Sequence, residues 1–276
     1  MSVTDLTQAW DDAVPALESD PMRPLRYRKC LRYVQTLDRG TAIADIGCGE
    51  GSGLLLLRTI GFRRLIGVEV SVERLHRART KLGDAVPLIL APATGALPFL
   101  DASVDVVVSA GVIEHTVDPR SFLSEISRVV RPGGCVVISS DCYSWRILQL
   151  VGLYRSVQPI DRALFPTTLF RHFHESGLQV IDYEGFRSPS GERSLPRMAA
   201  AILVALIAQA TLKMTRGAIG RRMKRSARHI LSQPSPDHLS PEGGRQGLEQ
   251  WPRKSGIASF LNLIFSDENV FFLVKK

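Results

Sequence analysis

The 276-residue chain is 45% hydrophobic and 22% charged, a balance that excludes an intrinsically disordered protein. Its length allows one domain, or one domain with an insertion, to bury a sizeable core. The net charge of +8 is local: residues 193–236 hold nine Lys or Arg and no acidic residue, so the rest of the chain sums to −1 (+8 less nine).

Alternating apolar runs and helical patterns predict the elements in chain order. Residues 1–39 are predicted as an N-terminal helical segment, 40–190 as an α/β core, and 258–276 as a final strand that returns to this core. The predicted strands cover 42–46, 64–70, 86–90, 104–109, 134–140, 178–183 and 269–274. The predicted helices cover 24–38, 51–60, 72–82, 119–130 and 167–176. Nearly continuous β-branched strands that alternate with helices indicate a doubly wound, parallel sheet.

A glycine-rich loop follows the first predicted strand. Residues 43–53 carry glycine at every second position from 47 to 53, which lets the main chain turn sharply and approach a ligand closely. The next helix would direct free N–H groups toward an anionic group. Asp45 either fixes the turn by accepting from loop amides or orients an amino group of the ligand through water. A dinucleotide fingerprint would need glycine where Ser52 stands.

An acidic residue, Glu69, ends the second predicted strand, 18 residues after Gly51. In open α/β sheets, ligands bind beyond the carboxyl ends of the strands. A carboxylate at this place can accept both hydroxyls of a ribose, and we predict that role for Glu69. The alternative is that Glu69 caps the following helix, but Ser71 is better placed to do so.

Residues 131–134, Arg-Pro-Gly-Gly, are predicted to close the helix at 119–130 and to turn the chain into the next strand. The four cysteines are scattered without metal-ligand spacing. They are Cys30, Cys48, Cys135 and Cys142. We expect no signal peptide, and free thiols in a reducing cytoplasm.

An insertion over 191–257 separates the last two predicted strands. Residues 198–208 are eleven consecutive apolar residues, which is short of the ~20 that a membrane-spanning helix needs. Residues 212–230 place apolar side chains on one side of a helical projection and basic ones on the other. The segment 198–231 therefore either lies on the inner membrane surface or packs over the sheet edge as a lid. Both alternatives favour an apolar acceptor.

Together with the glycine loop and Glu69, three further motifs resemble class I S-adenosylmethionine-dependent methyltransferases. The similar branch holds small-molecule enzymes related to ubiquinone and menaquinone biosynthesis. The motifs are Leu97-Pro98-Phe99, Val104-Asp105-Val106-Val107 and Arg128-Val129-Val130-Arg131-Pro132-Gly133-Gly134. The resemblance covers about residues 40–186 and the final strand. It implies S-adenosyl-L-methionine as cofactor and a seven-stranded Rossmann-like sheet, in the order 3-2-1-4-5-7-6 with the last strand antiparallel.

The resemblance also implies which residues bind the cofactor. They are Asp45, Gly47, Cys48, Gly49, Gly51, Glu69, Val70, Ala93, Thr94 and Ala110. The family usually has an aspartate at the place of Ala93, where it bonds the adenine amino group. Here adenine has to rely on main-chain amides, the Thr94 hydroxyl or apolar stacking, and weaker cofactor binding is expected.

Residues 111–115 resemble a stretch that is proposed as a divalent metal site in ubiquinone-type O-methyltransferases. Glu114 and His115 match it, but Gly111 replaces the first carboxylate. Two remaining ligands make a poor site, so no metal is predicted. Glu114 and His115 stay candidate catalytic residues. His115 either acts as a general base toward a hydroxyl or packs beneath the cofactor.

The sequence thus predicts a methyltransferase for a hydrophobic small-molecule or lipid-like acceptor. The basic segment suggests a nucleic-acid methyltransferase as one alternative. It is disfavoured because residues 109–112 lack the Asn/Asp-Pro-Pro-aromatic signature and the basic run lacks interleaved aromatics. The other alternative, a catalytically silent methyltransferase-like binding protein, is supported only by Ala93. No oligomeric state is predicted.

Overall fold

The computed structural model describes residues 3–17, 23–141, 158–162, 164–186, 203 and 268–276. The predicted insertion over 191–257, with its segment 198–231, lies outside the described residues except for Leu203. The predictions made for that segment therefore stay predictions.

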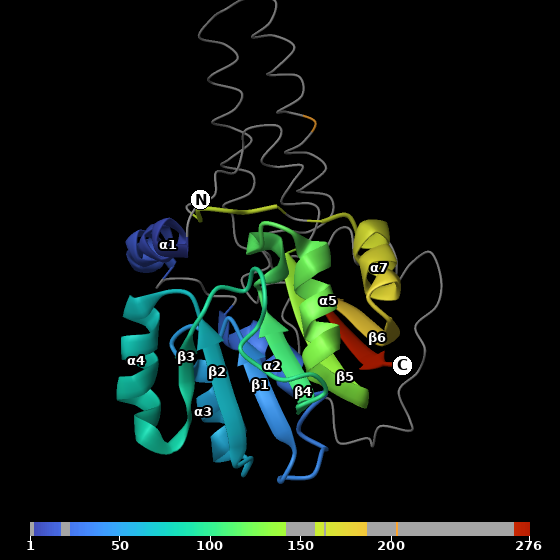
Figure 1. Cartoon of the computed structure of the whole chain (residues 1–276), viewed down its shortest axis with the longest axis horizontal. Coiled ribbons are helices and arrows are strands. Elements are labelled where there is room, and N and C mark those ends of the chain that lie inside the picture. Colours follow the sequence, from blue (N-terminus) through green and yellow to red (C-terminus); the bar gives the residue numbers. More distant parts are fainter. Residues whose placement is uncertain (1–2, 18–22, 142–157, 163, 187–202, 204–267) are drawn as a thin grey trace, which may run out of the picture.

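Seven strands form one sheet in the order β3-β2-β1-β4-β5-β7-β6 (Figure 1). All pairings are parallel except those of β7, which runs antiparallel to both β5 and β6. The predicted order and the antiparallel last strand are confirmed. The strands are β1 (Ala42–Ile46), β2 (Arg64–Glu69), β3 (Leu88–Leu90), β4 (Val104–Ala110), β5 (Val130–Asp141), β6 (Leu178–Phe186) and β7 (Glu268–Lys275).

Helices cover both faces of this sheet (Figure 1). Three of them, α2 (Arg23–Leu31), α3 (Ser52–Thr59) and α4 (Val72–Leu82), pack on one face. Two more, α5 (Pro119–Val129) and α7 (Pro166–Glu175), pack on the other. A further helix, α1 (Val3–Leu17), and the short 3₁₀ helix η2 (Ile113–His115) lie near the carboxyl ends of the central strands.

Alternate residues of the same strands build the two cores. In β4, Val106 and Val108 belong to the cluster with α2 and α3, whereas Val107 faces α5 and α7. In β7, Phe272 faces the first cluster and Phe271 the second. Both faces of these strands are buried, which explains why the strands are nearly continuous apolar runs in the sequence.

The helix predicted over 24–38 stops at Leu31, and that boundary was wrong. The chain then continues in tight turns that place Tyr33 against the far end of the sheet. The Tyr33 hydroxyl donates to Asp182 at 2.9 Å, and its ring stacks on Phe272 with 5.1 Å between centroids. These contacts with β6 and β7 come from distant sequence, so local helix pattern did not reveal them.

The boundary between α5 and β5 also differs from the prediction. The helix ends at Val129, because Val130 is already extended and pairs with Val104 of β4. The register shifts after this pair, and Gly133 has a φ of +73°, a value that glycine adopts readily. The Arg-Pro-Gly-Gly run is thus an irregularity inside β5 and not the turn before it.

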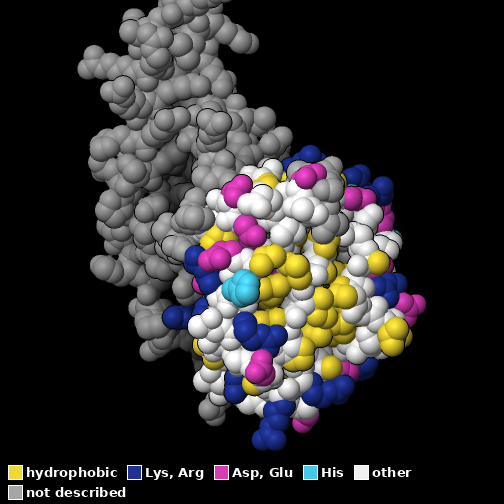
Figure 2. All heavy atoms as spheres, turned by 60° about the vertical axis from the view of Figure 1, so that its left-hand side comes forward, with side chains coloured by type: hydrophobic (Ala, Val, Ile, Leu, Met, Phe, Trp, Pro, Cys, Tyr) yellow, Lys and Arg dark blue, Asp and Glu magenta, His cyan; other side chains and the backbone are white. Residues whose placement is uncertain are grey.

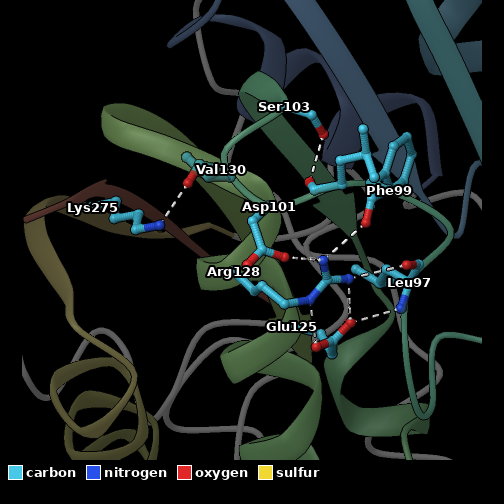
Figure 3. Close-up of polar contacts among 9 residues, drawn as sticks. Leu97, Phe99, Asp101, Ser103, Glu125, Arg128, Val130 and Lys275 are labelled. Carbon is cyan, nitrogen blue, oxygen red and sulfur yellow. Dashed lines mark hydrogen bonds and ion pairs between the residues drawn. The ribbon is translucent and has the colours of Figure 1, made fainter.

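One arginine of α5 fastens the loop that leads into β4 (Figure 3). Arg128 donates to the carbonyl oxygens of Leu97 and Phe99 at 3.1 and 2.9 Å, and its guanidinium pairs with Glu125 and Asp101. Glu125 also accepts from the Leu97 amide at 2.8 Å. The Leu-Pro-Phe and Arg motifs therefore contact each other, and their role in the described structure is architectural.

The edge of the sheet at β3 is thinly covered. The described loop between β3 and β4 contains no helix. Leu90 is 52% exposed, and Ile66, Ile89 and Phe99 are only partly buried. Figure 2, which turns this side of the molecule forward, shows hydrophobic side chains gathered on the surface.

Candidate functional site

A cavity lies where the carboxyl ends of β1, β2 and β4 meet α1 and α2. It is open to solvent and has a volume of about 100 Å³. The position is the switch point of the strand order, where open α/β sheets bind their ligands. Its lining includes most of the predicted site residues. These are Gly47, Cys48, Gly49, Glu69, Val70, Ala93, Thr94, Ala110 and His115.

The glycine loop has a backbone that requires glycine. Gly47, Gly49 and Gly51 have φ values of +77°, +54° and +73°. A Cβ on Gly47 would stand 2.3 Å from Val112, and one on Gly51 would stand 2.7 Å from Leu82 of α4. Gly47 and Gly49 present backbone to the cavity, whereas Gly51 packs the loop against α4 and is not among the described lining residues.

Glu69 lines the cavity with its carboxylate held by backbone amides. One carboxylate oxygen accepts from Gly49 N–H at 2.8 Å. The other accepts from Val70 N–H at 2.9 Å and from Ser71 N–H at 3.1 Å. Ser71 in turn caps α4 by accepting from Arg74 N–H, as predicted. Glu69 thus joins the loop after β1 to the end of β2 and fixes its carboxylate at the cavity wall.

Asp45 behaves differently from Glu69. It is fully buried behind the glycine loop, and its two carboxylate oxygens have no hydrogen-bond partner among the described residues. Burial, with the charge of Glu69, raises its pKa from 3.8 to about 8. Asp45 is also absent from the described lining of the cavity. The alternative that Asp45 fixes the turn by accepting from loop amides is therefore wrong in this structure.

His115 lies in η2 and reaches the cavity. Its Nδ1 is 2.7 Å from the carbonyl oxygen of Ile160, so Nδ1–H donates there and Nε2 keeps the lone pair. Burial lowers its pKa to about 3, with smaller contributions from Arg26 and Arg74. The Trp10 ring stands edge-on against the imidazole at 5.4 Å between centroids. The imidazole is therefore neutral at physiological pH and a weak base.

Glu114 is buried and is not among the described residues that line the cavity. One of its carboxylate oxygens accepts from Asp141 N–H at 3.2 Å and lies 3.8 Å from His115 Nε2. Gly111 has a φ of +69°, and a Cβ there would stand 2.9 Å from the Arg26 guanidinium. Within the described residues no group of three or more His, Cys, Asp or Glu is arranged to hold a metal ion.

Several lining residues were not predicted as site residues. They are Leu6, Trp10, Arg26, Tyr27, Glu50, Ser52, Val68, Arg74, Ala91, Gly111, Val112, Thr116 and Gln158. Two come from α1, whose Leu6, Trp10 and Ala13 form a small apolar cluster with Val70. The helical spacing of these three residues was a usable signal. No comparable signal in the sequence pointed to Arg26 and Arg74, because an arginine on a short helix ordinarily faces solvent.

A carboxylate of α1 also bonds the start of α4. Asp11 accepts from the Ser71 hydroxyl and, at 3.1 Å, from Glu73 N–H in the first turn of α4. Asp11 thus adds a partner for the free amides at the start of α4. In the part of the chain that the structure describes, no helix is long and apolar enough to cross a membrane.

A family model described as a methyltransferase domain matches residues 44–138. Among curated proteins, a "probable S-adenosylmethionine-dependent methyltransferase" of Mycolicibacterium smegmatis is 43% identical over 104 residues. That match covers 37% of this chain and 38% of the relative, so the chain spans well under half of that protein. The O-methyltransferase rstn1 of Aspergillus nomiae is 30% identical over 164 residues, which cover 55% of this chain and 71% of the relative.

Solved structures share the fold. The geranyl diphosphate C-methyltransferase of Streptomyces coelicolor, in complex with Mg²⁺, geranyl diphosphate and S-adenosyl-L-homocysteine, superposes with a TM-score of 0.55. The superposition covers 92% of this chain and 79% of that one at 13% identity. At that identity the likeness concerns the fold alone.

Proposed function

Because the chain belongs to the class I S-adenosylmethionine-dependent methyltransferases, we propose that it transfers a methyl group from S-adenosylmethionine to a hydrophobic small molecule. The observation that carries this proposal is the cavity wall formed by Glu69 and the glycine loop. There, a buried carboxylate and exposed backbone stand side by side at the switch point of the sheet.

The cavity suits the cofactor in its parts. Glu69 would accept the ribose hydroxyls, and the bare backbone of Gly47 and Gly49 leaves room for the amino-acid end. The Arg26 guanidinium, which lines the cavity beside Gly111, would pair with the cofactor carboxylate. The cavity thus offers an acceptor to the ribose and a cation to the carboxylate.

The adenine would lie against apolar side chains. Val70, Ala91 and Ala93 line this part of the cavity, and Thr94 supplies the one hydroxyl among them. The small Ala93 provides no carboxylate for the adenine amino group. We therefore expect adenine to be held mainly by apolar contact, with a lower affinity than a charged hydrogen bond would give.

When bound, S-adenosylmethionine supplies an activated methyl group on a sulfonium. The protein then mainly has to place the acceptor atom in line, about 3–3.5 Å from the methyl carbon, and to exclude water. Leu6 and Trp10 of α1 would form that cover. The His115 lone pair at Nε2 would accept a hydrogen bond from the acceptor and orient it, since its low pKa makes full proton abstraction ineffective.

An apolar acceptor accords with the walls near His115, which include Leu6, Trp10 and Val112. The basic amphipathic pattern of 198–231 supports a peripheral membrane contact, or a lid, that delivers such a molecule to the site. Sedimentation with anionic and neutral vesicles distinguishes these two roles.

The test is methyl transfer by the purified protein. The protein is incubated with a lipid-rich extract and S-adenosylmethionine labelled in the methyl group, and products are detected by mass spectrometry. We expect a labelled apolar product, formed together with S-adenosylhomocysteine, that Glu69→Gln reduces at limiting cofactor and Glu73→Gln does not. Label that appears only in nucleic acid, or in no product, would reject the proposal.

A further inference from the structure

The cavity has lining residues that the proposed function does not assign to the cofactor. Leu6 and Trp10 of α1, Arg74 of α4 and His115 of η2 all line it. The contact of Trp10 with His115 and the bonds from Asp11 to the first turn of α4 bring these elements together. These residues combine an aromatic ring and an apolar side chain with one guanidinium group.

The Arg74 guanidinium has no partner among the described residues. Its Nε is buried without a hydrogen bond, and no hydrogen bond or ion pair of its side chain to a described residue is found. Its neighbours on α4 differ, since Arg77 pairs with Glu73 at 2.9 Å and Arg79 with Asp84 at 3.1 Å. A half-buried cation without a partner is costly unless a ligand supplies an anion.

The acidic side chains of the cavity are already engaged elsewhere. Glu69 accepts from three backbone amides, and Glu50 lies 3.8 Å from Lys81 and 3.9 Å from Arg77. Among these contacts, neither carboxylate forms a hydrogen bond or an ion pair with Arg74.

The cofactor cannot balance every cation of the cavity. It carries one carboxylate, which the proposed function assigns to Arg26, and it adds an ammonium and a sulfonium of its own. Arg26 and Arg74 both lower the pKa of His115, which means that both guanidinium charges act on this region. An anionic group of the acceptor would supply the partner that Arg74 lacks among the described residues.

We propose that the acceptor carries an oxyanion, a carboxylate or a phosphate, which Arg74 binds while its apolar part packs on Leu6 and Trp10. This inference rests on the proposed function. It narrows the acceptor from any apolar molecule to an amphipathic acid, and it makes Arg74 a specificity-determining residue. The planar guanidinium suits both oxyanions through paired hydrogen bonds.

Isothermal titration of the full chain saturated with S-adenosylhomocysteine tests this inference. The probes are benzoate, phenyl phosphate and the neutral ester methyl benzoate, which share one ring. We expect at least one anion to bind at least tenfold more tightly than the ester. Arg74→Gln should abolish this preference, Arg74→Lys should keep part of it, and the matched control Arg79→Gln should leave it unchanged. The better of the two anions identifies the carboxylate or the phosphate.

Three results would overturn the inference. The wild-type complex binds neither anion better than the ester, or Arg74→Gln keeps the preference, or Arg74→Gln weakens S-adenosylhomocysteine itself by tenfold or more. The last result would assign Arg74 to the cofactor. If the wild-type protein does not bind S-adenosylhomocysteine, the proposed function is rejected. That result is obtained before any probe is added, so it is distinguished from a failure of the inference about Arg74.

Discussion

Two buried carboxylates, Asp45 and Glu69, stand close to the glycine loop with opposite surroundings. Three amides bond Glu69, whereas Asp45 has no hydrogen-bond partner among the described residues and also feels the negative charge of Glu69. At the scale of single residues, Glu69 is thus prepared as an acceptor in the folded state. Asp45 is instead a buried carboxyl group without hydrogen bonds in the part of the chain that the structure describes, and a cationic ligand nearby would stabilise its ionised form.

Asp45→Asn should make the ligand-free protein more stable, and more so at pH 9 than at pH 5. The pKa of Asp45 is about 8 in the folded state against 3.8 ordinarily, so the folded protein holds a proton that the unfolded chain releases. The contribution of Asp45 to stability is therefore full below about pH 3.8 and is lost as the pH rises through 8. Thermal melts of both proteins at the two pH values measure this. An equal gain at both would contradict the account.

The imidazole of His115 should remain neutral between pH 5 and pH 8. Its pKa of about 3 in the folded state lies below the ordinary 6.5, because the ring is buried. His115 therefore costs stability as the pH falls below about 6.5, where the unfolded chain takes up the proton. NMR of the ring C–H signals, assigned with His115→Gln, should show no titration in that range. A midpoint near 6.5 would mean that the ring is solvated and free to act as a base.

At the scale of elements, the hydrogen bonds of a single side chain can fix the position of a whole segment. Asp11 seats α1 on α4, and Arg128 fastens the loop before β4 to α5. Neither contact follows from local pattern. Asp11 is one of several acidic residues in an amphipathic helix, and its partners Ser71 and Glu73 lie some sixty residues away.

Asp11→Ala should loosen α1. The loss of a carboxylate that bonds the first turn of α4 should lower the free energy of unfolding by about 1 kcal/mol, as for a helix cap. Hydrogen exchange in residues 3–17 should accelerate. The matched control is Asp12→Ala, whose carboxylate accepts from Gln8 on the same helix. Equal exchange in the two variants would show that Asp11 does not hold α1.

Arg128→Ala should lower the free energy of unfolding by about 2–3 kcal/mol, because two carbonyl oxygens and two carboxylates lose their donor. The control is Arg120→Ala, which breaks an exposed ion pair with Glu175 and should cost much less, because solvent screens that pair. Urea unfolding of both variants provides the comparison. Similar losses would mean that the loop before β4 does not depend on Arg128.

At the scale of the whole molecule, the sheet was predictable because its central strands are buried on both faces and read as apolar runs. The strand order and the antiparallel β7 followed from the family resemblance. The position of α1 on α4 and the end of α2 at Leu31 were not predictable, since they depend on contacts with distant strands and helices.

The residues of the site likewise include some that the sequence predicts and some that it does not. Gly47, Gly49 and Glu69 were found because a turn with positive φ and a carboxylate at a strand end leave a spacing in the sequence. Arg26 and Arg74 belong to no spacing pattern of this kind. Their positions at the cavity depend on how α2 and α4 pack, and a charged residue on a helix is usually solvated.

Glu69 and the glycine loop are proposed to bind the nucleoside of the cofactor, and calorimetric titration with S-adenosylhomocysteine measures that binding. We predict saturable binding by the wild type and by the exposed control Glu73→Gln. Glu69→Gln should bind about 10- to 150-fold more weakly, the loss expected for a charged hydrogen-bond acceptor. No binding at millimolar S-adenosylhomocysteine, or equal affinity in all three proteins, would contradict the account.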